Sequence, residues 1–118
     1  MTTNLYVPDV AAEAAFFTAI GFSEVDRQEL GGTESIVLAP DQFGNARLQI
    51  FDKAFIKAVS PEVADSVPSV LFSVPDLEAF HQLVSAQHGF TSAIQDLGGR
   101  RVFNFQAPSG TYFAATGK

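Results

Sequence analysis

The sequence predicts an α+β fold built from two βαβββ modules in tandem, which form curved mixed sheets. The phrase ValProAsp occurs twice, ending at Asp9 and at Asp76, and an apolar helical pattern follows it each time. The phrases QELGG from Gln28 and QDLGG from Gln95 stand at the same distance after these two aspartates. Two shared phrases in one register indicate an internal repeat. Each copy has one helix for four strands, which can cover only one face of its sheet.

The first module is expected to span about residues 1–52, with a helix at about 9–20. Asp9 precedes the first apolar residue of this helix, so its carboxylate can accept from free N–H groups of the first turn. Gly21 ends the helix. The strands are expected at about residues 3–8, 22–30, 33–39 and 45–51. The apolar face of the helix is expected to comprise Val10, Ala14, Phe17, Ala11 and Ile20.

The second module is expected to span about residues 68–118, with a helix at about 76–88 that Gly89 ends. Asp76 is its cap, so both repeated aspartates are interpreted as capping rather than catalytic residues. The strands are expected at about residues 68–74, 90–96, 100–106 and 111–116. The apolar helix face is expected to comprise Leu77, Phe80 and Val84. A connector at about residues 53–67, with a short helical turn, joins the modules into a single domain over residues 1–118.

The composition narrows the class of partner. The 118 residues are 47% hydrophobic, which is ample for one core, and no apolar run is long enough to span a membrane. Thirteen acidic against seven basic residues oppose nucleic-acid binding. The acidic surface is interpreted first as a device for solubility, and it would also attract a cationic small molecule. The first nine residues lack the pattern of a signal peptide, so a cytoplasmic location is expected. Without cysteine there is no disulfide and no thiolate chemistry.

The face of each sheet that the helix leaves open carries the candidate ligand-binding residues. Along a strand, alternate side chains point to opposite faces, so the polar and aromatic residues between the core positions share one face. They mix aromatic, amide, hydroxyl and guanidinium groups, which is typical of a small-molecule cleft. Of the adjacent pair Arg100–Arg101, at most one can point to that face, whereas the face of Phe103 and Phe105 stays open. The candidates are Asn4, Tyr6, Arg47, Gln49, Phe51, Ser73, Arg101 and Tyr112.

These modules resemble the vicinal oxygen chelate superfamily, which contains glyoxalase I, extradiol dioxygenases, fosfomycin-resistance enzymes and bleomycin-resistance proteins. The resemblance is carried by the two ValProAsp strand ends and by helices that run into GlyPhe in AAFFTAIGF and SAQHGF. The segment NLYVPDVAAEAAFFTAIGF is most similar to the start of the bleomycin-resistance type. The resemblance implies sheets curved around a cleft, and two chains that pair as a homodimer with two clefts.

The resemblance also implies four metal-ligand positions, near the start of the first and fifth strands and in the last strand of each module. In this sequence they are Thr2, Ser69, Gln49 and Ala114. A divalent catalytic metal prefers carboxylate or imidazole ligands, so no metal and no other cofactor is expected.

Other side chains do not replace the missing ligands. His81 and His88 lie seven residues apart and are interpreted as surface or cap residues. A solvated acidic edge, rather than a cleft rim, is expected of Glu24, Asp26, Glu29 and Glu34.

The sequence favours a metal-independent protein that binds a partly aromatic, cationic small molecule, such as an antibiotic. No catalytic residue is identified, since GxSxG, GxGxxG and phosphate-loop motifs are all missing. Two alternatives stay open. One is an enzyme of the same superfamily, a lyase, dioxygenase or transferase, with a non-standard metal site. The other is a non-catalytic dimeric interaction domain.

Overall fold

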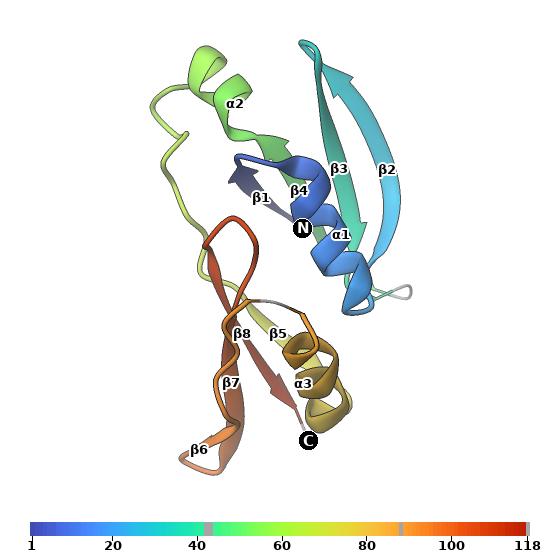
Figure 1. Ribbon diagram of the computed structural model, residues 1–118, viewed down its shortest axis with the longest axis vertical. Helices are drawn as coiled ribbons and strands as arrows, with labels where there is room; N and C mark the ends of the chain where they lie inside the picture. Colours follow the sequence, from blue (N-terminus) through green and yellow to red (C-terminus); the bar gives the residue numbers. More distant parts are fainter. Residues whose placement is uncertain (42–43, 88, 118) are drawn as a thin grey trace. The chain divides into compact units, whose positions relative to one another are not determined.

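The computed structural model describes residues 1–41, 44–87 and 89–117, and the chain divides into two compact units. Unit 1 is Met1–Pro68 and unit 2 is Ser69–Lys118 (Figure 1). The expected connector therefore groups with the first module. Within it, residues Lys53–Val59 form helix α2, capped by Asp52 and anchored by buried Ile56, where a shorter helical turn was expected. None of the described helices is long and apolar enough to cross a membrane.

Unit 1 contains a four-stranded mixed sheet in the order β1–β4–β3–β2. The first strand pairs in parallel with β4, and the other neighbours are antiparallel. GlyGly at Gly31 and Gly32, both with positive φ, makes the hairpin turn between β2 and β3. The strands are β1 (Thr2–Val7), β2 (Ser23–Leu30), β3 (Thr33–Ala39) and β4 (Arg47–Asp52), and helix α1 is Val10–Ala19.

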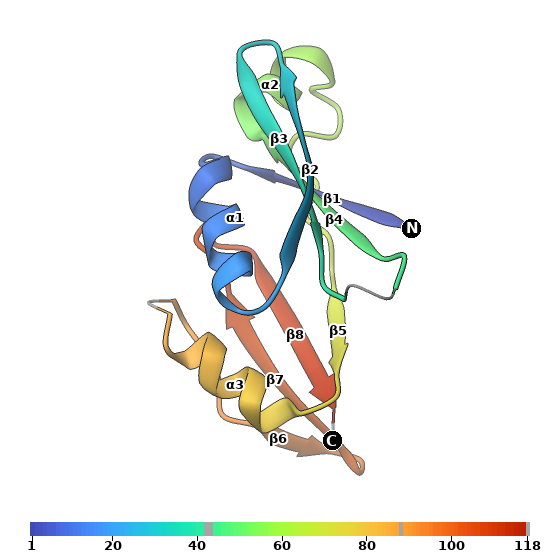
Figure 2. The same cartoon turned by 90° about the vertical axis from the view of Figure 1, so that its right-hand side faces the viewer.

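Helix α1 lies along one side of this sheet (Figure 2). It begins where predicted, because the Asp9 side chain accepts a hydrogen bond from the Ala12 N–H at 3.1 Å. The expected core positions Val10, Ala14, Phe17 and Ile20 are buried. Ala11 is exposed, so its assignment to the core face was wrong. Two residues that the pattern missed, Glu13 and Phe16, are buried instead.

Replacing Asp9 by alanine is expected to lower the free energy of unfolding by about 1 kcal/mol, because a first-turn N–H group loses its acceptor. Asp9→Asn keeps a side-chain oxygen at the same place and should cost only a few tenths of that. Denaturant unfolding of both variants measures the difference. Equal losses in the two would show that the negative charge, rather than the hydrogen bond, stabilises the helix.

Unit 2 repeats the arrangement, with a sheet in the order β5–β8–β7–β6 and helix α3 on one side of it (Figures 1 and 2). Asp76 caps α3 through the Ala79 N–H at 3.1 Å, which confirms the second capping prediction. The elements are β5 (Leu71–Val74), α3 (Leu77–Ser85), β6 (Gln95–Leu97), β7 (Arg100–Gln106) and β8 (Tyr112–Gly117). The α+β fold of two βαβββ modules is therefore confirmed.

The strand expected at residues 90–96 is shorter than predicted. Only Gln95–Leu97 forms a strand, while Thr91 makes an isolated bridge to Phe105. The Ser92 hydroxyl accepts the Asn104 N–H at 2.9 Å, so a side chain takes a backbone donor of the neighbouring strand. Such side-chain bonds compete with the regular ladder and explain the gap. The helix expected to reach residue 88 ends at Ser85, and His88 lies outside the described residues.

The core of unit 2 is a cluster of phenylalanines between α3 and the sheet. Phe103 and Phe105 belong to it, which settles the face that the sequence left open. Phe105 stacks on Phe113 at 5.7 Å and on Phe72 at 6.4 Å between ring centroids, and Phe80 closes the cluster from α3. These rings hold the sheet against its helix.

Candidate ligand-binding faces

The sheet of unit 1 presents one face opposite α1, and its register brings five predicted residues together there. Asn4 pairs with Gln49, and Tyr6 pairs with Phe51, across the parallel β1–β4 ladder. Arg47 precedes them on the same side of β4. The alternation of the sequence thus placed these side chains correctly relative to buried Leu5, Val7, Leu48 and Ile50 on the helix side.

This face has an aromatic end and an amide end. The Tyr6 and Phe51 rings lie 5.9 Å apart at 55°, and both are half-buried. Next to them Gln49 Nε2 donates to Ser35 Oγ at 3.0 Å, and Ser35 Oγ donates to the Ile50 carbonyl at 3.1 Å. This chain fixes the Gln49 amide and leaves its oxygen as a free acceptor among the described residues. Sequence reasoning missed Ser35, although a hydroxyl between Glu34 and Ile36 on an alternating strand was the available signal.

Arg47 is held by its own loop. Its Nη1 donates to the carbonyl oxygens of Gly44 at 3.1 Å and Ala46 at 2.8 Å. Its remaining N–H groups have no partner among residues 1–41, 44–87 and 89–117, and they lie at the edge of the face. Asn4 is exposed beside Gln49.

In unit 2 the equivalent face carries Ser73 and Tyr112. Ser73 is exposed and pairs with Thr116, and Tyr112 pairs with Gln106 at the start of β8. The Tyr112 ring meets Phe90 edge to face at 6.1 Å. Both aromatic side chains are more than half exposed, which leaves them available to a ligand or a partner.

Arg101 is not brought to this face. It alternates with buried Phe103, so it lies on the helix side of β7. There its Nη2 donates to Glu78 Oε1 of α3 at 2.9 Å. The structure thus separates Arg101 from Ser73 and Tyr112, with which the sequence grouped it.

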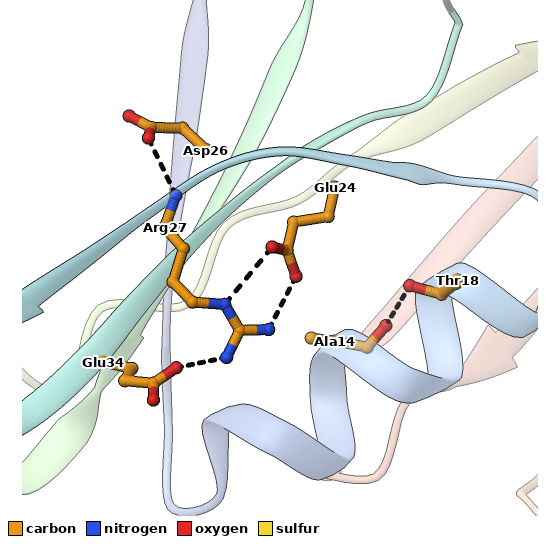
Figure 3. A network of polar contacts seen from close by, with 6 residues as sticks. All are labelled: Ala14, Thr18, Glu24, Asp26, Arg27 and Glu34. Atoms are coloured by element: carbon orange, nitrogen blue, oxygen red, sulfur yellow. Dashed lines mark hydrogen bonds and ion pairs between the residues drawn. The ribbon is translucent and has the colours of Figure 1, made fainter.

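The acidic edge of unit 1 is organised around an arginine that sequence reasoning missed. Arg27 donates through Nη2 and Nε to both oxygens of Glu24, at 2.7 and 3.2 Å, and through Nη1 to Glu34 (Figure 3). Both partners raise the pKa of Arg27, and the hydrogen bond to Glu24 has the larger effect. The same hydrogen bond lowers the pKa of Glu24. In a regular strand residues 24 and 27 would face opposite sides; the bulge between Glu24 and Asp26 puts them on one side.

The stability of the protein is expected to depend weakly on this ion triad as the pH falls. Because the folded-state pKa of Glu24 is below its ordinary value of 4.5, the contribution is complete above that pH and is lost as the pH drops through the folded value. The effect is small, since the pair is exposed to solvent. Urea midpoints between about pH 3 and pH 7 should fall less steeply for Glu24→Gln than for the wild type. Identical slopes would show that the triad is broken in solution.

A family model for the Glyoxalase/Bleomycin resistance protein/Dioxygenase superfamily matches residues 2–114. The chain belongs to this superfamily. No curated protein matches the sequence closely. The match over nearly the whole chain agrees with the tandem modules seen in the structure.

Several solved structures share the fold at low sequence identity. TnmS3, an antibiotic binding protein from Streptomyces sp. CB03234, is 16% identical with a TM-score of 0.79, covering 98% of this chain and 92% of its own. A bleomycin-binding protein complexed with bleomycin is 19% identical with a TM-score of 0.71, and the match covers 100% of this chain and 97% of that protein. A lactoylglutathione lyase from Agrobacterium tumefaciens is 18% identical with a TM-score of 0.71, and the match covers 99% of this chain and 91% of the lyase. At such identities the likeness establishes the fold.

The superfamily's enzymes imply a divalent metal, and the residues at the four places that the sequence resemblance assigns to its ligands do not fit one. Thr2 and Ser69 are exposed hydroxyls, Gln49 is an amide already bonded to Ser35, and Ala114 has no donor atom. Carboxylate and imidazole ligands are lacking at all four places. Within residues 1–41, 44–87 and 89–117, no three His, Asp or Glu side chains group closely enough to hold a metal ion.

The described histidine, His81, has a packing role. Its ring meets Phe103 edge to face at 4.7 Å, and its Nε2 donates to the Ser92 carbonyl at 2.8 Å. It is partly buried rather than a free surface residue.

Proposed function

We propose that this superfamily member is a metal-independent small-molecule binding protein whose ligand is partly aromatic and cationic. The observation that carries the proposal is the aromatic and amide face of Tyr6, Phe51 and Gln49, whose amide is held in place by buried Ser35. Such a surface can hold a planar group by ring contacts and orient it by hydrogen bonds. Binding of this kind needs no metal, acid or base.

The charge of the protein supports a cationic guest. Its formal net charge of −6 concentrates cations near the surface and repels anions. Asn4 and Arg47 are the further residues that we propose for this face of unit 1, and Ser73 and Tyr112 are those that we propose for the equivalent face of unit 2. The antibiotic-binding relatives make an antibiotic one candidate ligand. We propose a cytoplasmic location for the protein.

We also propose that two copies of the chain pair as a homodimer. Large apolar side chains are exposed in unit 2, with Leu71 at 46% and Leu97 at 60%. Covering them by a second copy would remove apolar surface from water. Sedimentation equilibrium measures the molecular mass directly. A monomer at all concentrations would rule out the pairing.

The binding function is tested with the purified protein and three probes: bleomycin, the planar cation proflavine, and the anion 1-naphthalenesulfonate. Isothermal titration calorimetry in the presence of a chelator should detect binding of the two cations, and weak or no binding of the anion. No binding and no thermal shift with any probe, together with a tight dimer, would replace this proposal by a purely dimeric interaction domain.

Catalysis is the second candidate, because the lactoylglutathione lyase of Agrobacterium tumefaciens shares the fold. Elemental analysis of purified protein decides between them. A stoichiometric divalent metal that survives dialysis would overturn the metal-independent proposal and point to a non-standard metal site.

A further inference from the structure

A groove of about 700 Å³ lies in unit 1 between α1 and the β2–β3 hairpin. It is on the helix side of the sheet, opposite the face that carries Tyr6 and Gln49, because Ile36 and Arg27 line it and Ile36 pairs with Ile50. Its volume is within the range of small-molecule sites. The groove is therefore a separate feature from the proposed ligand-binding face.

One wall of the groove is a row of small side chains. Ala11, Ala15 and Ala19 recur at every fourth position of α1, and all three are exposed. The larger Phe16 and Phe17 of the same helix are buried. Because alanine side chains are too short to reach β2, the helix side of that strand is left uncovered and the groove is hollow.

The other wall carries a charge that its own groups do not balance. Arg27 lies between Glu24 and Glu34 and faces Ala14 and Thr18 of α1 (Figure 3). Two carboxylates against one guanidinium leave a net charge of −1 in the groove. Glu34 bonds to Arg27 through Oε2, and its Oε1 has no hydrogen-bond or ion-pair partner among the described residues. A carboxylate oxygen of this kind accepts from a further cationic donor.

We propose that this groove binds a primary alkylammonium ion with a short aliphatic chain. The chain lies along the alanines of α1, and the ammonium group donates to Glu34 Oε1. The stretch from Ala11 to Ala19 is about 12 Å long, which accommodates a six-carbon chain. An alkyl carboxylate of the same shape meets the net negative charge and is rejected. This site is independent of the proposed function, because its residues lie on the opposite face of the sheet.

The test uses the full chain, hexylammonium as the probe and hexanoate as the matched anion. Amide chemical shifts in a titration should change saturably at Ala11, Ala15, Arg27 and Glu34 with hexylammonium, and not with hexanoate. Butylammonium should bind more weakly, by roughly fourfold for each methylene removed from contact. Equal shifts with both hexyl probes, or no saturable shift, would overturn the proposal.

Three variants define the contacts. Glu34→Gln should weaken the binding of hexylammonium roughly two- to fivefold, as for an exposed ion pair. Glu62→Gln removes the same charge from an exposed turn after α2 that does not line the groove, and it should change little. Ala15→Leu fills the groove without disturbing a buried residue and should weaken binding roughly tenfold by displacing methylenes. If Ala15→Leu binds as tightly as the wild type, the groove is not the site.

Failure of this proposal is distinguishable from failure of the proposed function. Tyr6→Ala should leave hexylammonium binding unchanged, because Tyr6 is on the other face. Loss of hexylammonium binding in Tyr6→Ala would move the cation to the aromatic face and overturn the groove assignment.

Discussion

Replacing Phe105 by alanine is expected to lower the free energy of unfolding by about 4 kcal/mol, the largest loss at any single ring of unit 2. The side chain is fully buried. Its ring contacts those of Phe72, Phe80, Phe103 and Phe113 at centroid distances of 5.7 to 6.4 Å. The substitution therefore opens a cavity where four other rings meet, and their contacts are lost without replacement.

Denaturant unfolding followed by circular dichroism measures this loss, and hydrogen exchange locates it. The amides of β7 and β8 should lose most of their protection, because these strands carry the affected rings. Tyr112→Ala is the matched control: it removes a ring that is 57% exposed on β8 and should cost no more than about 1 kcal/mol. A loss at Phe105 as small as that of the control would show that the phenylalanine cluster is loosely packed.

The parts of the fold that depend on local chemistry could be predicted from the sequence. Asp9 and Asp76 each accept a backbone N–H three residues ahead, so the caps are determined by neighbouring residues alone. The GlyGly turns at Gly31 and Gly98 likewise need only the positive φ that glycine allows. The sequence repeat then showed which element of the second module corresponds to which element of the first.

The parts that depend on partners distant in the sequence could not be predicted. The shortening of β6 depends on the Ser92 hydroxyl meeting Asn104 of another strand. The Arg27 triad depends on a bulge in β2, which changes the side of the sheet that Glu24 faces. The sequence assigned Arg101 to the open face of the sheet. That was wrong, because the alternation of β7 could be assigned to the two faces only once Phe103 and Phe105 were located in the core.

The candidate site shows the same division. Alternation placed Asn4, Tyr6, Gln49 and Phe51 on one face, because the period of a strand is a local property. The hydrogen-bond chain through Ser35 joins β3 to β4, so it depended on the pairing of two strands. A face that is prepared by a neighbouring strand in this way holds its amide in one orientation, which lowers the entropy cost of binding.

Adjacent substitutions on β1 should separate binding from stability. Tyr6→Ala is expected to weaken the tightest-binding planar cation by roughly tenfold, because the ligand loses a ring contact, and to lower the free energy of unfolding by only about 1 kcal/mol. Val7→Ala is expected to leave the affinity unchanged and to cost about 2–3 kcal/mol, because Val7 is fully buried on the helix side.

Isothermal titration and denaturant unfolding of both variants measure the two effects independently. The comparison is sharp because Tyr6 and Val7 are neighbours whose side chains point to opposite faces of one strand. If Tyr6→Ala loses stability but binds the cation as the wild type does, the ligand does not touch this face. In that case the Tyr6–Phe51 ring pair is a packing contact, and the proposed binding function loses its main support.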